Sequence, residues 1–139
     1  MELTVVGCSG SAPSPESQSP GYLLSSGDSR IVIELGNGTL GPLQEWIDPF
    51  DINALFPTHL HPDHCADFAP LVVHLRYRPN QPYDPKQHRL PVYAPPEAPS
   101  RLAAQYAPNA GQVAGTDLSD VFARHRAVRN FRRECLWSP

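Results

Sequence analysis

Three histidines and a carboxylate lie within six residues of this chain, in the run THLHPDH at residues 58–64. Imidazole nitrogens and carboxylate oxygens are the donors that bind zinc, manganese and iron in proteins. In extended chain the side chains of His59 and His61 would point to the same side, so the two could hold one ion. Asp63 and His64 follow a proline turn and could hold a second ion. The run therefore predicts a metal site.

A predicted strand and a predicted helix position this run. The apolar residues 52–56 indicate a buried strand that ends just before the histidines. Apolar residues in the following segment recur at helical spacing, which predicts a helix at residues 68–77 with Asp67 as its N-cap. The apolar stripe comprises Phe68, Leu71, Val72 and Leu75. This arrangement would place the metal site at the rim of a sheet.

The rest of the chain alternates short strands and helices between many prolines and glycines. Two strands are expected to form a hairpin around the Gly27-Asp28 turn. Trp46 is expected in the core. The order favours an α/β (α+β) fold, a mixed β-sheet with flanking helices. The further elements expected are strands at 2–6, 22–26, 30–35, 90–93 and 118–123, and helices at 39–47 and 97–106.

Composition limits the cell compartment and the class of partner. The 139 residues suffice for one domain with its own core, and the formal net charge is −3. Three cysteines at wide spacing argue against a disulfide framework, and free thiols fit a reducing cytoplasm. No stretch is long and apolar enough to predict a membrane span. We expect a soluble cytoplasmic protein without a membrane partner.

The run at 58–64 resembles the H-x-H-x-D-H signature of the metallo-β-lactamase superfamily. Residues 7–13 (GCSGSAP) are similar to the glycine-rich first loop of the branch that holds ribonuclease Z and certain cyclic-nucleotide phosphodiesterases. Residues 33–39 (IELGNGT) match the place where that branch has an acidic residue before a Gly-x-Gly turn. Glu34 stands there instead of the usual Asp. The resemblance runs from residue 1 to about residue 123.

This resemblance implies the N-terminal half of an αββα metallo-β-lactamase sandwich. It implies two Zn²⁺ ions, with Mn²⁺ or Fe as alternatives, and His59 and His61 as ligands of one ion. Asp63 and His64 would be ligands of the other, and Asp63 could also act as the catalytic base. The activity implied is hydrolysis of a phosphodiester, either a cyclic nucleotide or an RNA 3′ end, by a hydroxide held by the metal.

Family members complete the site with a third His, a bridging Asp and a last His, all downstream. After His64 this chain has only His74, His88 and His125, and none stands in the family's context. The alternative function is therefore a truncated, catalytically inactive fragment with at most weak metal binding.

The charge changes abruptly near the end of the resemblance. Residues 1–123 carry a net charge of −7, whereas residues 124–139 carry +4 because of five arginines. We expect 1–123 to be the N-terminal half of a metallo-β-lactamase-like domain. The tail 124–139 is interpreted as frameshifted or non-family sequence, with an ordinary basic tail as the alternative.

The acidic charge of residues 1–123 also bears on the substrate, because RNA processing normally needs a basic surface. A small-molecule or nucleotide phosphodiester is therefore favoured as substrate over RNA. A homodimer remains open.

Overall fold

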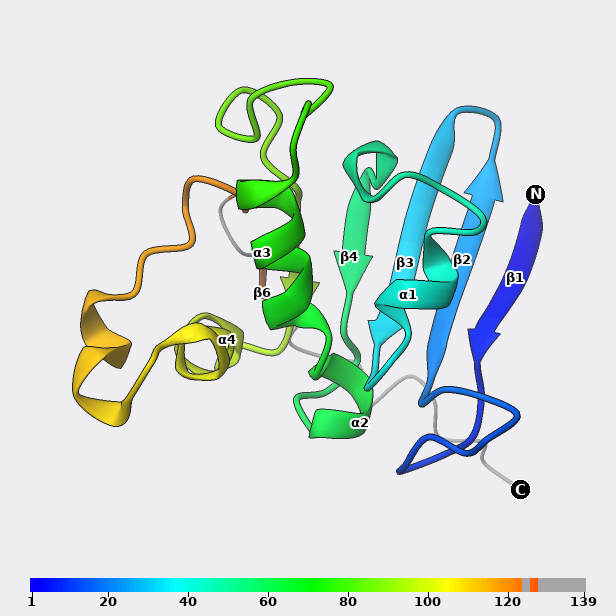
Figure 1. The fold of residues 1–139 in the computed structure, drawn as a ribbon, viewed down its shortest axis with the longest axis horizontal. Helices are drawn as coiled ribbons and strands as arrows, with labels where there is room; N and C mark the ends of the chain where they lie inside the picture. Colours follow the sequence, from blue (N-terminus) through cyan, green and yellow to red (C-terminus); the bar gives the residue numbers. More distant parts are fainter. Residues whose placement is uncertain (124–125, 128–139) are drawn as a thin grey trace.

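The computed structural model describes residues 1–123 and 126–127, so that most of the arginine-rich tail, His125 included, lies outside the described residues. A four-stranded mixed sheet runs in the order β1-β2-β3-β4 (Figure 1). The first three strands are antiparallel, and β4 runs parallel to β3. Their bounds are β1 (Glu2–Gly7), β2 (Gly21–Ser26), β3 (Ser29–Leu35) and β4 (Ala54–Phe56).

Helices and two very short strands complete the described chain. Beyond β4, parallel bridges join Leu55 to Val92 and Leu90 to Phe122, and β5 pairs in parallel with β6. No helix in this part of the chain is both long and apolar enough to cross a membrane. The elements are α1 (Leu40–Leu43), η1 (Pro49–Asp51), α2 (Pro62–Cys65), α3 (Phe68–Tyr77), β5 (Tyr93–Ala94), α4 (Ala98–Tyr106), η2 (Ala110–Gly115) and β6 (Arg126–Ala127).

The core lies between the sheet and the helices. Leu23, Val32 and Leu55 stand side by side on three neighbouring strands, and each is almost fully buried. The predicted apolar stripe of α3 is buried along its whole length and belongs to the same cluster. Burial of each such side chain contributes roughly 1.5–3 kcal/mol, so this contact between sheet and helix holds the fold together.

Several predicted elements are confirmed. The helix expected at 68–77 is α3, and the hairpin expected at 22–35 is formed by β2 and β3 around Gly27. Gly27 has a positive φ of 55°, which suits a glycine in a tight turn. The helix expected at 97–106 begins one residue later, as α4. The mixed sheet with flanking helices is confirmed as well.

Other expectations are wrong. The helix expected at 39–47 is only the single turn α1, Leu40–Leu43, two of whose four residues, Gly41 and Pro42, are poor helix formers. Trp46 lies beyond this helix and is 59% exposed rather than in the core. The strand expected at 90–93 is displaced to β5, with only isolated bridges before it.

The strand expected at 118–123 is also wrong, since this segment turns back on itself. The carbonyl of Leu118 accepts N–H bonds from Val121 (3.2 Å) and Phe122 (3.0 Å). Arg76 on α3 holds the same segment, donating to both carboxylate oxygens of Asp120 at 2.8 and 2.5 Å. A long-range ion pair has thus overridden the local apolar pattern.

Asp67 ties the start of α3 to the turn that follows β3. Its carboxylate accepts the N–H groups of Gly38 (3.0 Å) and Leu40 (2.8 Å), and its own N–H donates to the Leu35 carbonyl (3.1 Å). Asp67 stands at the predicted N-cap position, but its side chain makes no cap bond to its own helix. It therefore joins two segments and supports the start of α1.

Gly36 allows α2 to sit directly on the end of β3. A Cβ atom at this residue would lie 2.0 Å from the backbone oxygen of Asp63 and 2.8 Å from that of Pro20. Both obstacles are backbone atoms, which cannot rotate away as a flexible side chain can. Only glycine therefore permits this approach of the histidine run to the sheet.

We predict that Asp67→Ala lowers the free energy of unfolding by about 3 kcal/mol, because one part-buried and one buried N–H group lose a charged acceptor. Urea unfolding would measure the change. Asp84→Ala is the matched control, since among the described residues this exposed carboxylate accepts a single hydrogen bond, from the N–H of Lys86. Equal losses for the two variants would contradict the role of Asp67.

We also predict that Gly36→Ala lowers the free energy of unfolding by more than about 2 kcal/mol, because the added methyl group forces α2 away from β3. Gly41→Ala is the control, since it stands in α1 and no atom lies within 4 Å of the position that its methyl group would take. This control should be neutral or stabilising by up to about 1 kcal/mol. Indistinguishable urea midpoints would show that α2 does not need this glycine.

Candidate metal site

The histidine run occupies the connection between β4 and α3. The strand ends at Phe56, as expected, and His59 and His61 lie in the loop beyond it. His61 stands at the N-cap position of α2 with φ −71° and ψ 148°. The proline that follows it begins the helix, where its fixed φ is favourable. Asp63 and His64 are then held within the single turn of α2.

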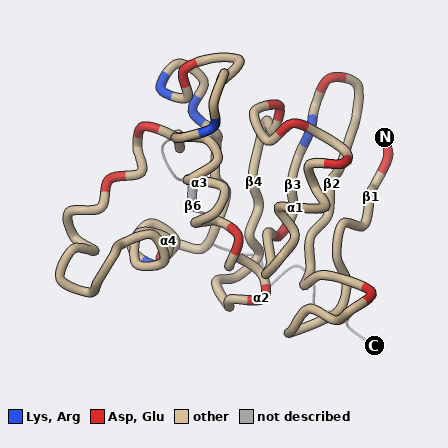
Figure 2. Tube along the Cα trace, viewed as in Figure 1, with Lys and Arg blue, Asp and Glu red and all other residues tan. Residues whose placement is uncertain are grey.

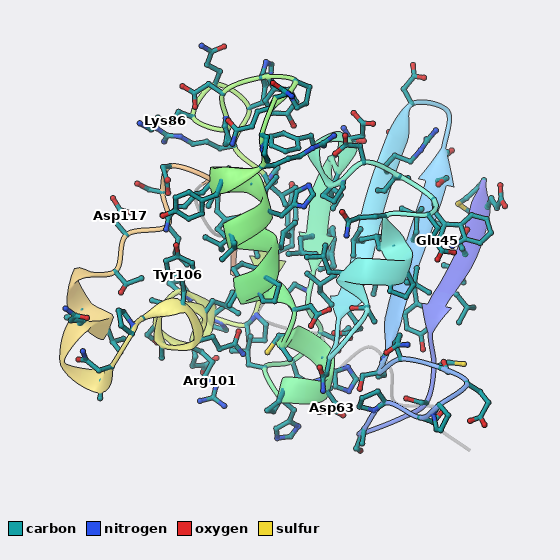
Figure 3. The ribbon with its side chains drawn as sticks, in the orientation of Figure 1. Glu45, Asp63, Lys86, Arg101, Tyr106 and Asp117 are labelled. Atoms are coloured by element: carbon teal, nitrogen blue, oxygen red, sulfur yellow. The ribbon has the colours of Figure 1, made fainter. Side chains whose placement is uncertain are left out.

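The four predicted ligands are neighbours in space. The ring centroids of His59 and His64 are 3.8 Å apart, and those of His59 and His61 are 4.9 Å apart with perpendicular planes. Asp63 Oδ2 lies 3.3 Å from His64 Nε2. Asp63 itself lies at the same end of the molecule as Arg101, and Lys86 lies at the opposite end (Figure 3).

Glu34 joins this cluster from the end of β3. One ligand atom from each of Glu34, His59 and His64 lies within 4.8 Å of the others. The Glu34 side chain is almost fully buried, and its Oε2 is 3.4 Å from His64 Nδ1. The sequence alone did not place Glu34 among the candidate ligands. Its signal was the acidic position before the Gly-x-Gly turn.

A β-bulge aims Glu34 at the histidines. Ile33 pairs with Tyr22 and Leu35 pairs with Gly21, so Glu34 is an extra residue in the ladder. Its φ is +60°, a conformation that non-glycine residues rarely adopt. Bulges of this kind redirect a side chain, and they are over-represented beside functional sites. Here the bulge turns a carboxylate into the loop that carries the histidine run.

Thr58 connects Glu34 to His59. The Thr58 N–H and hydroxyl both donate to the Glu34 carboxylate, the N–H at 3.3 and 3.2 Å from its two oxygens. Since the one hydroxyl proton is used there, Thr58 Oγ1 can only accept from His59 Nδ1, 3.0 Å away. This fixes the proton of His59 on Nδ1 and leaves Nε2 free as a ligand atom, the arrangement that supports metal-binding histidines.

The surroundings favour a neutral His59. Burial, reinforced by the nearby His64 ring, lowers the pKa of His59 below its usual value. A histidine must be neutral to bind a metal ion, so this shift favours the ligand form. His64 Nδ1 is buried without a hydrogen bond, because its 3.4 Å contact with Glu34 is not aligned as one. Two imidazoles with available nitrogens and a buried carboxylate are a donor set that fits zinc, manganese or iron.

Cys65 packs beneath the run. Its side chain is 1% exposed, and burial raises the pKa of its thiol. The sulfur donates to the His61 carbonyl at 3.3 Å and accepts from Gln105 of α4 at 3.1 Å. Cys65 therefore supports the backbone of the loop and links it to α4.

The other histidines lie elsewhere. His74 of α3 packs against the Phe50 ring, with centroids 5.9 Å apart, and burial lowers its pKa. His88 is exposed beside Tyr83, with ring centroids 4.7 Å apart. No contact among the described residues joins either of them to the cluster.

Comparison with known proteins agrees with this architecture. An uncharacterized protein of Mycobacterium tuberculosis is 40% identical over 126 residues, which are 90% of this chain and 44% of that relative. The probable metallo-hydrolase YhfI of Bacillus subtilis is 31% identical over 93 residues, 67% of this chain and 37% of YhfI. This chain thus spans less than half the length of either relative.

Solved structures share the fold. The crystal structure of YhfI, described as a metallo-beta-lactamase fold protein, superposes with a TM-score of 0.65 at 25% identity, over 91% of this chain and 44% of YhfI. The short form of human tRNase Z gives a TM-score of 0.67 at 20% identity, over 88% of this chain and 42% of its own. A family model described as the Metallo-beta-lactamase superfamily matches residues 15–105. This chain therefore belongs to the metallo-beta-lactamase superfamily.

Proposed function

We propose that this chain carries the metal-binding half-site of a hydrolase that cleaves phosphodiesters. The observation that supports it most is the convergence of Glu34, His59 and His64, whose ligand atoms lie within 4.8 Å of one another. His61 and Asp63 adjoin this group through ring and carboxylate contacts. The relative YhfI, described as a probable metallo-hydrolase, is consistent with hydrolysis in general.

The proposed ligands are His59, His61, Asp63 and His64, with Glu34 as an additional candidate. Two Zn²⁺ ions, or Mn²⁺ or Fe in their place, are the proposed cofactors. When bound, such ions activate water and offset negative charge on phosphoryl oxygens.

The chain's own residues prepare the site for this chemistry. Thr58 and Glu34 hold His59 in one tautomer, and the bulge at Glu34 keeps that support rigid. Asp63 lies on α2 beside His64, where its carboxylate can also act as a general base that accepts a proton from the attacking water. Gly36 and Asp67 fix the loop that carries the histidine run against the end of β3. The side chains of this loop are therefore positioned before any ligand binds.

A small phosphodiester such as a cyclic nucleotide is the proposed substrate, with RNA less favoured. Most Lys and Arg of the described chain lie at the end opposite α2 (Figure 2). The exposed Arg101 of α4 is the labelled cation that shares the end of Asp63 (Figure 3). One cation can meet a single phosphate, whereas RNA needs a longer basic track. The free thiols Cys8 and Cys65 are compatible with the proposed cytoplasmic location.

The inactive fragment is the less favoured alternative. Family membership and the preformed cluster both support metal binding by this part of the chain. Whether the tail 124–139 is family sequence stays a prediction from its charge.

We predict that the chain, loaded with zinc or manganese, hydrolyses bis-p-nitrophenyl phosphate. His59→Ala and His64→Ala should each reduce both bound metal and the hydrolysis rate, the rate by more than about 100-fold. Metal analysis of the purified protein and a colorimetric rate assay would measure the two quantities. The matched control is His88→Ala, because His88 is exposed and its ring packs against the Tyr83 ring.

The two readouts separate binding from catalysis. Metal that survives both His59→Ala and His64→Ala would refute the proposed ligands. Little or no bound metal and no hydrolysis by the unmodified chain would instead support the inactive fragment.

We further predict that hydrolysis of a cyclic nucleotide changes little with salt concentration, because a substrate of one phosphate releases few counterions. Measuring kcat/KM for a cyclic nucleotide and for a short single-stranded RNA over a series of salt concentrations tests this. A higher kcat/KM for the RNA, falling steeply with salt, would reverse the substrate assignment.

A further inference from the structure

Gln105 of α4 reaches the histidine run through Cys65. Its Nε2 lies 3.1 Å from the Cys65 sulfur, and that sulfur lies 3.3 Å from the His61 carbonyl oxygen. Among the described residues, the bond from Gln105 to Cys65 is the only hydrogen bond between α4 and residues 58–65. The Cys65 side chain is 1% exposed, so the connection lies inside the protein. A helix remote in sequence is thereby joined to the backbone of a proposed ligand.

The direction of these two bonds is fixed by their donors and acceptors. The His61 carbonyl can only accept, so the single proton of the Cys65 thiol points to it. The sulfur can then only accept from Gln105, which requires the amide nitrogen, and not the amide oxygen, to face it. The amide oxygen Oε1 is buried and has no hydrogen-bond partner among the described residues.

Stability alone does not explain a glutamine at this position. A buried oxygen without a partner lowers the stability of the fold, and a leucine of similar size would remove that cost. What leucine could not supply is the N–H group that Gln105 donates to Cys65. The use of this donor is therefore sought in the residue at the other end of the connection, His61.

His61 is the proposed ligand with the weakest support from its own side chain. It is exposed, whereas His59, Asp63 and His64 are partly buried. Its ring packs against the His59 ring, with centroids 4.9 Å apart. The His61 carbonyl, by contrast, accepts both the His64 N–H at 2.9 Å and the Cys65 thiol. The position of the His61 ring therefore depends on how its backbone is held.

We propose that Gln105 is a positioning residue for the metal site. It holds the Cys65 thiol against the His61 carbonyl and so keeps His61 beside His59. This inference rests on the proposed function and adds to it a residue from a helix outside the histidine run. Loss of a hydrogen-bonded neighbour of a metal ligand typically weakens metal binding 10–100-fold. Because Gln105 acts through a thiol, we expect the lower end of this range.

Gln105→Leu separates positioning from stability. The metal-free variant should resist urea at least as well as the unmodified chain, because it loses the unpartnered oxygen. Its zinc affinity, measured by competition with a chromophoric chelator, should fall roughly 10-fold. The matched control is Gln81→Leu, since the Gln81 Nε2 donates at 2.7 Å to the Leu75 carbonyl near the C-terminal end of α3. This control should leave the zinc affinity unchanged.

Substitutions at Cys65 test the route. Cys65→Ser keeps a group that both donates and accepts, so it should retain most of the zinc affinity. Cys65→Ala breaks both bonds and should weaken zinc binding about as much as Gln105→Leu does. The double variant Gln105→Leu with Cys65→Ala should bind zinc no more weakly than either single variant, because the two residues act in one connection. Effects that multiply would show that Gln105 does not act through Cys65.

Histidine NMR signals of the metal-free chain give a readout that does not depend on zinc. Gln105→Leu should shift the imidazole signals of His61 and leave those of His88 in place. Unchanged zinc affinity in Gln105→Leu, or a fall that is matched by a lower urea midpoint, would overturn the positioning role alone. An unmodified chain that binds no zinc would refute the proposed function, and the role of Gln105 with it.

Discussion

The buried carboxylate of Glu34 is the contact on which the arrangement of the histidine run depends. Burying a carboxylate is costly unless donors surround it, and Thr58 supplies two of them from within the loop that carries the run. The carboxylate can be satisfied only if this loop returns to the end of β3. One electrostatic requirement thus fixes the position of the loop, and the histidines that follow Thr58 are positioned with it.

The short segment from Glu34 to Leu40 supplies further supports of the run. The Leu35 carbonyl accepts the Asp67 N–H, and Gly36 leaves room for the Asp63 backbone. The Gly38 and Leu40 N–H groups hold the Asp67 carboxylate in turn. The loop is therefore fixed at its start, its middle and its end by seven consecutive residues. This explains how a connection with a single turn of α2 can present a defined group of side chains.

Local patterns were predictable from the sequence, whereas features that depend on pairing were not. The α3 stripe was predicted because its helical spacing is contained in ten residues, and the hairpin because its turn is marked by Gly27. The direction of the Glu34 side chain depends on a bulge, and this bulge is defined only by the pairing register of β2 and β3. The segment at 118–123 failed for a similar reason, since its partner Arg76 lies on a distant helix. The spacing of the run suggested a metal site, but the contribution of Thr58 and Glu34 to it required the structure.

The negative charge of the proposed site bears on both metal binding and substrate binding. Glu34 and Asp63 bring two negative charges beside three imidazoles, which must be neutral to act as ligands. The segment around them is itself acidic, since residues 1–123 carry a net charge of −7. Such a site would repel a phosphodiester, because like charges at close range are strongly unfavourable in partly buried surroundings. Two divalent ions would change the local charge from about −2 to about +2, and this reversal would make an anionic substrate favourable there. The acidic residues that seem to argue against a phosphate substrate are therefore the ones that would allow the site to bind it.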